Sequence, residues 1–198
     1  MTTNSGEKLY ANTGATSSLV GRLGIACMVA AVLTGILSGL WELASPNFSD
    51  PQTFGSSPIG QRIGHALLEV IKTVGFLAGL LGFWLAATKR GRVTKVFLAL
   101  AVFGGLFYII VQMRNALTGD FTLMYVLGGL WYQMIAPVAL GIAALTARRI
   151  KWPKAAWAIA VGLINSQIFA LFSPGYALIV QGVIWLVFGY ITYSLRSR

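Results

Sequence analysis

The chain has 198 residues, of which 57% are hydrophobic and only 10% are charged. A water-soluble domain carries about 25% charged residues, so this composition excludes an ordinary soluble protein and indicates a chain that lies mostly in lipid. The formal net charge of +10 does not indicate a nucleic-acid-binding protein, because the Lys and Arg residues occur in short clusters between apolar runs.

The first 17 residues differ from the rest of the chain. They are polar and rich in Thr, Asn, Ser and Gly, so we predict that residues 1–17 form a flexible cytoplasmic N-terminal tail. Residues 18–198 are predicted to form one transmembrane domain. The first apolar run is longer than the roughly 7–15 residues of a signal-peptide core, and we expect it to be an uncleaved first helix.

Six apolar runs follow the tail. They are Ser18–Ala44, Gly60–Thr88, Thr94–Leu117, Phe121–Ala147, Lys154–Phe172 and Tyr176–Leu195. Each is close to the roughly 20 residues that a helix needs to cross about 30 Å of hydrocarbon. Backbone polar groups in lipid must be satisfied within their own segment, which favours helices for runs of this length. We therefore predict an all-α integral membrane protein that forms a single bundle of six transmembrane helices.

The distribution of charge predicts the orientation of this bundle. With six spans, 12 of the 15 Lys and Arg residues fall on one side. These are Lys8, Arg22, Lys89, Arg90, Arg92, Lys95, Arg148, Arg149, Lys151, Lys154, Arg196 and Arg198. Loops on the cytoplasmic side are enriched in Lys and Arg, so both termini are predicted to be cytoplasmic. Size and helix count favour a bacterial inner (plasma) membrane.

Pairs of glycines four residues apart occur in the first two predicted helices. Gly35 and Gly39 form one pair, and Gly75 and Gly79 form the other. Small residues at this spacing allow helices to approach closely in lipid. We predict that both pairs pack helices within one molecule; a homo-oligomer remains an alternative.

Strongly polar side chains are confined to the halves of the helices that lie away from the basic clusters. They are Arg62, His65, Glu69, Lys72, Gln112, Arg114, Asn115, Gln133, Asn165, Gln167 and Gln181. An ionised group at the bilayer centre costs about 3 kcal/mol, so such residues usually pair or line a wet cavity. The asymmetry indicates a polar region in the outer half of the bundle.

The second predicted helix carries the densest group of these residues. Arg62, His65, Glu69 and Lys72 are spaced three, four and three residues apart, so they share one face of a helix. His65 can pair with Glu69, and Glu69 can pair with Lys72. We predict an outward-facing cavity walled by this face. Its candidate ligand-binding residues are Arg62, His65, Glu69, Lys72, Arg114, Gln133 and Asn165, with Trp131 and Tyr132 at the mouth.

A structural role would explain the same residues. Lys72 is predicted to lie about one turn inside the membrane, where a lysine can reach the headgroups. The charged group would then only anchor the end of the helix. The Gln and Asn residues would form hydrogen bonds between helices.

Motifs for known chemistry are lacking. The sequence has no Walker loop, HExxH, GxSxG or CxxC motif. Its single cysteine, Cys27, and single histidine, His65, are too few for a protein metal centre of the usual kind. We therefore predict no metal, no cofactor and no catalytic residue.

The resulting functional prediction is a non-enzymatic membrane protein that binds or transports an amphipathic or lipid-like small molecule. The main alternative is an accessory or assembly subunit of a larger membrane complex, in which the polar helix face would meet a partner protein. An intramembrane enzyme that modifies lipids is the weaker alternative.

Overall fold

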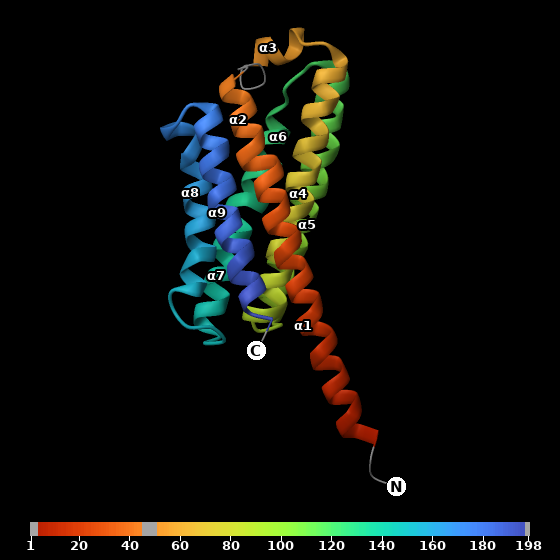
Figure 1. The fold of residues 1–198 in the computed structure, drawn as a ribbon, viewed down its shortest axis with the longest axis vertical. Coiled ribbons are helices and arrows are strands. Elements are labelled where there is room, and N and C mark those ends of the chain that lie inside the picture. Colours follow the sequence, from red (N-terminus) through yellow and green to blue (C-terminus); the bar gives the residue numbers. More distant parts are fainter. Residues whose placement is uncertain (1–3, 45–50, 197–198) are drawn as a thin grey trace.

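The protein is a bundle of long helices (Figure 1). The computed structural model describes residues 4–44 and 51–196, and within these ranges it contains helices and turns but no strand. The predicted all-α class is confirmed. In chain order the elements are α1 (Asn4–Ala30), η1 (Ala31–Ile36), α2 (Leu37–Ala44), α3 (Pro51–Ser56), α4 (Ile59–Ala87), α5 (Arg92–Thr118), α6 (Leu123–Leu130), η2 (Trp131–Ile135), α7 (Ala136–Thr146), α8 (Lys154–Leu171) and α9 (Pro174–Ser194).

Five helical stretches within the described residues are long and apolar enough to cross a membrane. They are Thr16–Ala44, Ile59–Ala87, Arg92–Thr118, Leu123–Thr146 and Pro174–Ser194. The first joins α1, η1 and α2, and the fourth joins α6, η2 and α7. The joins are continuous because each π-helical turn has α-helical dihedral angles at both of its caps. These spans support the prediction of a multi-pass membrane protein.

Two predictions about the ends and the number of spans are not settled by the fold. Helix α8 lies beside α9 (Figure 1), but its described apolar stretch, Lys154–Asn165, is shorter than a span. A sixth span stays a prediction. Helix α1 begins at Asn4, inside the predicted tail, whose mobility also stays a prediction. Residues 1–3 and Arg198 lie outside the described residues.

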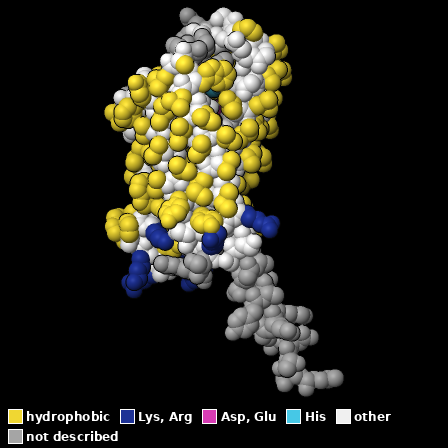
Figure 2. Space-filling view, viewed as in Figure 1, with side chains coloured by type: hydrophobic (Ala, Val, Ile, Leu, Met, Phe, Trp, Pro, Cys, Tyr) yellow, Lys and Arg dark blue, Asp and Glu magenta, His cyan; other side chains and the backbone are white. Residues whose placement is uncertain are grey.

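The surface of the bundle is apolar along most of its length (Figure 2). Large side chains such as Phe103, Ile110 and Leu123 are about two-thirds exposed or more. In water an apolar surface of this extent would drive aggregation, whereas in a bilayer it faces the lipid tails. Lys and Arg side chains gather at one end, which we call the basic end (Figure 2); Lys89, Arg90, Arg92 and Lys95 are exposed there.

Glycines hold α9 against the first membrane-spanning helix. The two helices meet where Gly24 approaches Gly189, where Gly35 approaches Gly182, and where Gly39 approaches Gly175. A Cβ on Gly182 would lie 2.8 Å from the Ile36 nitrogen and 2.9 Å from the Ala31 oxygen, so no larger residue fits without a shift. Gly75 and Gly79 in turn approach Ala30 and Cys27 of α1. Both glycine pairs therefore pack helices within the chain, as predicted.

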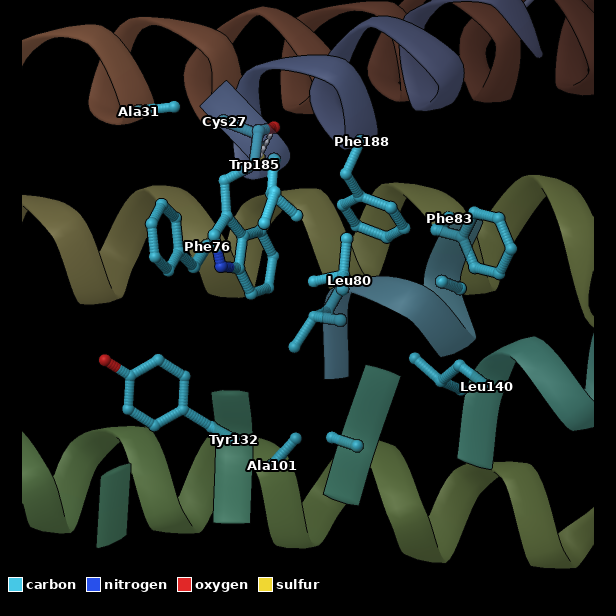
Figure 3. Packing of buried hydrophobic residues seen from close by; sticks show 14 of the residues in the cluster. Cys27, Ala31, Phe76, Leu80, Phe83, Ala101, Tyr132, Leu140, Trp185 and Phe188 are labelled. Atoms are coloured by element: carbon cyan, nitrogen blue, oxygen red, sulfur yellow. Dashed lines mark hydrogen bonds between the residues drawn. The ribbon is translucent and has the colours of Figure 1, made fainter. Parts of the chain in front are cut away.

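The aromatic core lies between α4 and α9 (Figure 3). Phe76 stacks on Trp185 with ring centroids 4.0 Å apart, and Trp185 meets Phe188 edge to face at 5.4 Å. Each pair of this kind stabilises the fold by about 0.5–1.5 kcal/mol beyond its area burial. Cys27 is fully buried beside this stack, and its Sγ donates to the Trp185 carbonyl oxygen at 3.6 Å. The core occupies the part of α4 and α9 that lies toward the basic end, and polar residues take its place toward the other end.

Candidate functional site

A buried ion pair lies on the inner face of α4. Lys72 Nζ is 2.5 Å from Glu69 Oε1, and both residues are less than 10% exposed. The spacing of three residues brings the two side chains together on one helix face. Tyr108 of α5 donates its hydroxyl hydrogen to the other carboxylate oxygen, Glu69 Oε2, at 2.7 Å. Glu69 is thus held by a cation and a phenol from two helices, which compensates the cost of burying its charge.

A cluster of three side-chain amides faces the ion pair from the opposite side of the bundle. We call Gln133, Asn165 and Gln181 the amide cluster; they come from η2, α8 and α9. Gln181 Nε2 donates to Gln133 Oε1 at 2.9 Å and to Asn165 Oδ1 at 3.3 Å. Gln181 is fully buried, yet its Oε1 has no hydrogen-bond donor among the described residues. A buried acceptor without a partner is costly.

Pro137 lies one helical turn after the Gln133 carbonyl that Asn165 contacts. Proline lacks the N–H that would bond to the carbonyl four residues earlier, here that of Gln133. Asn165 Nδ2 lies 3.5 Å from the Gln133 carbonyl oxygen and donates to it, and it also reaches Gln133 Oε1 at 3.4 Å. The π-helical turn η2, Trp131–Ile135, directly precedes this point. Such turns often occur at functional sites.

A chain of hydrogen bonds connects the amide cluster to α4. Gln133 Nε2 donates to the Tyr132 hydroxyl at 2.7 Å, and that hydroxyl lies 3.2 Å from Thr73 Oγ1. Thr73 Oγ1 donates to the carbonyl oxygen of Glu69 at 2.8 Å. Each member restricts the orientation of the next, so the polar groups on both sides are fixed relative to each other.

The two polar groups line one cavity of about 420 Å³, which we call the central cavity. Its lining residues come from α2, α4, α5, α6, η2, α8 and α9 and from the turn before α6. They are Glu42, His65, Glu69, Lys72, Tyr108, Phe121, Tyr125, Val126, Gly129, Leu130, Gln133, Met134, Asn165, Pro174, Leu178 and Gln181. The cavity therefore lies in the half of the bundle away from the basic end.

Five of the nine predicted ligand-binding residues line this cavity. These are His65, Glu69, Lys72, Gln133 and Asn165. His65 lies near the start of α4, and its ring centroid is 6.0 Å from that of Phe54 in an edge-to-face arrangement. His65, Glu69 and Lys72 thus share one face of α4, as their spacing predicted. Asn165 lines the cavity from α8.

The other four predicted residues do not line the cavity. Arg62 donates from Nη1 to the Gly55 carbonyl oxygen at 2.9 Å and thereby ties α4 to α3. Arg114 is exposed on α5, because its helix turns that position outward. Trp131 packs beside Gly104, and Tyr132 is fully buried behind Gln133. Neither aromatic side chain of η2 therefore forms a mouth to this cavity.

Several lining residues escaped sequence reasoning. Tyr108 lies within an apolar run that carries no periodic signal, and Tyr125 resembles an interfacial aromatic. Glu42 lies near the end of the first span, but the structure buries it in the wall. For Gln181 the sequence predicted only a hydrogen bond between helices. Its position opposite Glu69 depends on the crossing of α9 with α4, which no local pattern encodes.

The side chains of this site offer hydrogen bonds and apolar contacts. Within the described residues, no three His, Cys, Asp or Glu side chains gather closely enough to hold a metal ion. The cavity combines a neutralised ion pair, an aromatic wall and fixed amides, which suits a molecule with a polar end and an apolar body.

Comparisons with known proteins give no further guide to this site. No family model, curated protein or solved structure matches the chain.

Proposed function

We propose that the protein is a six-span bundle whose basic end faces the cytoplasm and whose central cavity faces outward. Helix α8 has 18 residues, which corresponds to about 27 Å and nearly crosses the hydrocarbon. The exposed Lys and Arg side chains at the loops after α4 and α7 favour the cytoplasm for that end.

Cysteine labelling tests this topology. The native cysteine, Cys27, is buried. It is first replaced with alanine, so that each variant carries only the introduced cysteine. In intact cells a membrane-impermeant maleimide should label Ser173→Cys, on the turn between α8 and α9, but should label Arg149→Cys only after lysis. Both positions are exposed. Labelling of both on the same side would mean that α8 does not span the membrane.

We further propose that the central cavity binds, and in the cell carries, a small amphipathic molecule. The observation that supports this most strongly is the cavity itself, which has the Glu69–Lys72 ion pair on one wall and the amide cluster on the other. A volume of about 420 Å³ falls within the roughly 300–1,000 Å³ typical of small-molecule sites.

The lining favours a particular kind of ligand. The Glu69 and Lys72 charges offset each other, so a strongly charged head would have no counter-charge in this pair. A hydroxyl or amide N–H would instead form hydrogen bonds with the side-chain amides of Gln133 and Asn165, which also line the cavity. Val126, Leu130 and Leu178 provide apolar wall. The expected ligand has a head that donates hydrogen bonds and an apolar body of modest length.

The polar face of α4 does not require a partner protein. Glu69 is already bound by Lys72 and by Tyr108 of the same chain, and the face is turned into the bundle. An accessory-subunit role would therefore need another surface, and the cavity proposal is favoured over it.

Filling the cavity tests the proposal. Leu178 is half-buried in its wall, and Leu178→Trp should occupy the space of the ligand. Native mass spectrometry of the wild-type protein in mild detergent should show an added mass of roughly a few hundred daltons. The added mass should disappear in Leu178→Trp and in Gln181→Leu.

The matched control is Leu106→Trp, the same exchange at a lipid-facing position that is 54% exposed. This variant should keep the added mass. Absence of a discrete adduct from every sample, or its equal retention in Leu178→Trp, would overturn the proposed binding function.

A further inference from the structure

A second hollow lies on the lipid-facing side of the bundle between α5 and α7. We call it the side groove; its volume is about 700 Å³. Its walls are apolar and largely exposed, with Val93 on α5, Ile135 on η2, Ile142 on α7 and Leu163 on α8. The groove is distinct from the central cavity, and Met134 contributes to the walls of both.

The length of the side groove matches one leaflet of a bilayer. It extends along η2 and α7 from Met134 to Thr146, a distance of about 18 Å at 1.5 Å per residue. Half of the hydrocarbon thickness is about 15 Å. An acyl chain that enters from the basic end would therefore fill the groove down to the middle of the membrane.

Two cations lie at one end of the side groove and no acid lines it. Lys89 and Arg92 are both exposed, and neither has an ion-pair partner among the described residues. Thr94, beside them, turns its hydroxyl to the backbone of Lys89 and Gly91. The groove thus combines an apolar channel for a chain with a positive end at headgroup depth.

We propose that the side groove binds an anionic phospholipid. One acyl chain lies along α7, and the phosphate lies between Lys89 and Arg92. Anionic headgroups are attracted to basic residues at this depth. A helix from a second copy of the chain would fit the apolar walls but would leave both cations without a counter-charge. Apart from Met134, the side groove shares no lining residue with the central cavity, and the proposal stands independently of the function of that cavity.

Native mass spectrometry with defined lipids tests the proposal. The full-length protein is exchanged into detergent with equal amounts of phosphatidylglycerol and phosphatidylcholine of the same chain length. We expect one phosphatidylglycerol to bind with about tenfold preference. Lys89→Gln/Arg92→Gln should remove the preference. Ala139→Trp, which fills the groove, should remove the bound lipid altogether.

Two controls make the result decisive. Arg148→Gln/Arg149→Gln removes two charges from the same end outside the groove, and Ala99→Trp adds the same bulk at an exposed position of α5 outside the groove. Both should keep the preference. Equal binding of the two lipids by the wild-type protein would overturn the proposal. Equal losses of lipid preference in the variants and in their controls would also overturn it. A lipid-free dimer that Ala139→Trp dissociates would overturn it as well, because it would assign the groove to a second copy of the chain.

Discussion

Replacing Glu69 with glutamine is expected to lower the free energy of unfolding by about 3–5 kcal/mol, because it leaves the buried Lys72 charge without its partner. For a protein of this size the change corresponds to a fall of roughly 6–20 °C in the unfolding midpoint. The measurement is thermal unfolding of the purified protein in detergent, followed by circular dichroism.

The double variant Glu69→Gln/Lys72→Met separates stability from binding. It removes both charges, and such neutral replacements of buried ion pairs are often tolerated, so most of the lost stability should return. Any added mass that the wild-type protein shows in native mass spectrometry should not return, because two polar groups of the cavity wall are gone. A single variant as stable as the wild-type protein would show that Lys72 reaches water, and the charges would then only anchor the end of α4.

Replacing Gly182 with alanine is expected to destabilise the bundle by about 1–3 kcal/mol, because the added methyl group has no room. Its Cβ would lie within 3 Å of the Ile36 nitrogen and the Ala31 oxygen, and backbone atoms cannot move aside as a flexible side chain can. Gly35→Ala, on the other side of the same contact, should have a similar effect. Thermal unfolding and the yield of monodisperse protein measure both.

Gly64→Ala is the matched control for the glycine contact. It also lies within a helix, but its Cβ would meet nothing within 4 Å. Alanine favours helix over glycine by about 0.5–1 kcal/mol, so this variant should be neutral or slightly more stable. If Gly182→Ala were as stable as Gly64→Ala, α9 would not pack against η1 at this distance.

The membrane class and most of the spans were predictable from the sequence because each follows from local composition. A run such as Thr94–Leu117 has one stable arrangement in lipid, and its charged flanks fix its ends. The π-helical turns were not predictable in the same way. The turn at Ala31–Ile36 surrounds the contact between Gly35 and Gly182, which depends on a helix nearly 150 residues away.

The candidate site was predictable in part for the same reason. His65, Glu69 and Lys72 are placed by the period of a single helix, and all three line the cavity. Tyr108 supplies the second partner of Glu69, but its sequence neighbours are apolar and no pattern distinguishes it. Arg114 was chosen for its charge and predicted depth alone, and the rotation of α5 places it on the outside of the bundle. Depth along a helix could be estimated from sequence, whereas the direction of each side chain required tertiary packing.

The most direct measurement of the proposed function is a density map of the protein reconstituted with lipids from its host membrane. We expect an elongated density in the central cavity, with one end within hydrogen-bonding distance of Gln133 or Asn165 and a body along Leu178. A cavity that holds only ordered water, or one closed by its own side chains, would contradict the proposal that this site binds an amphipathic molecule.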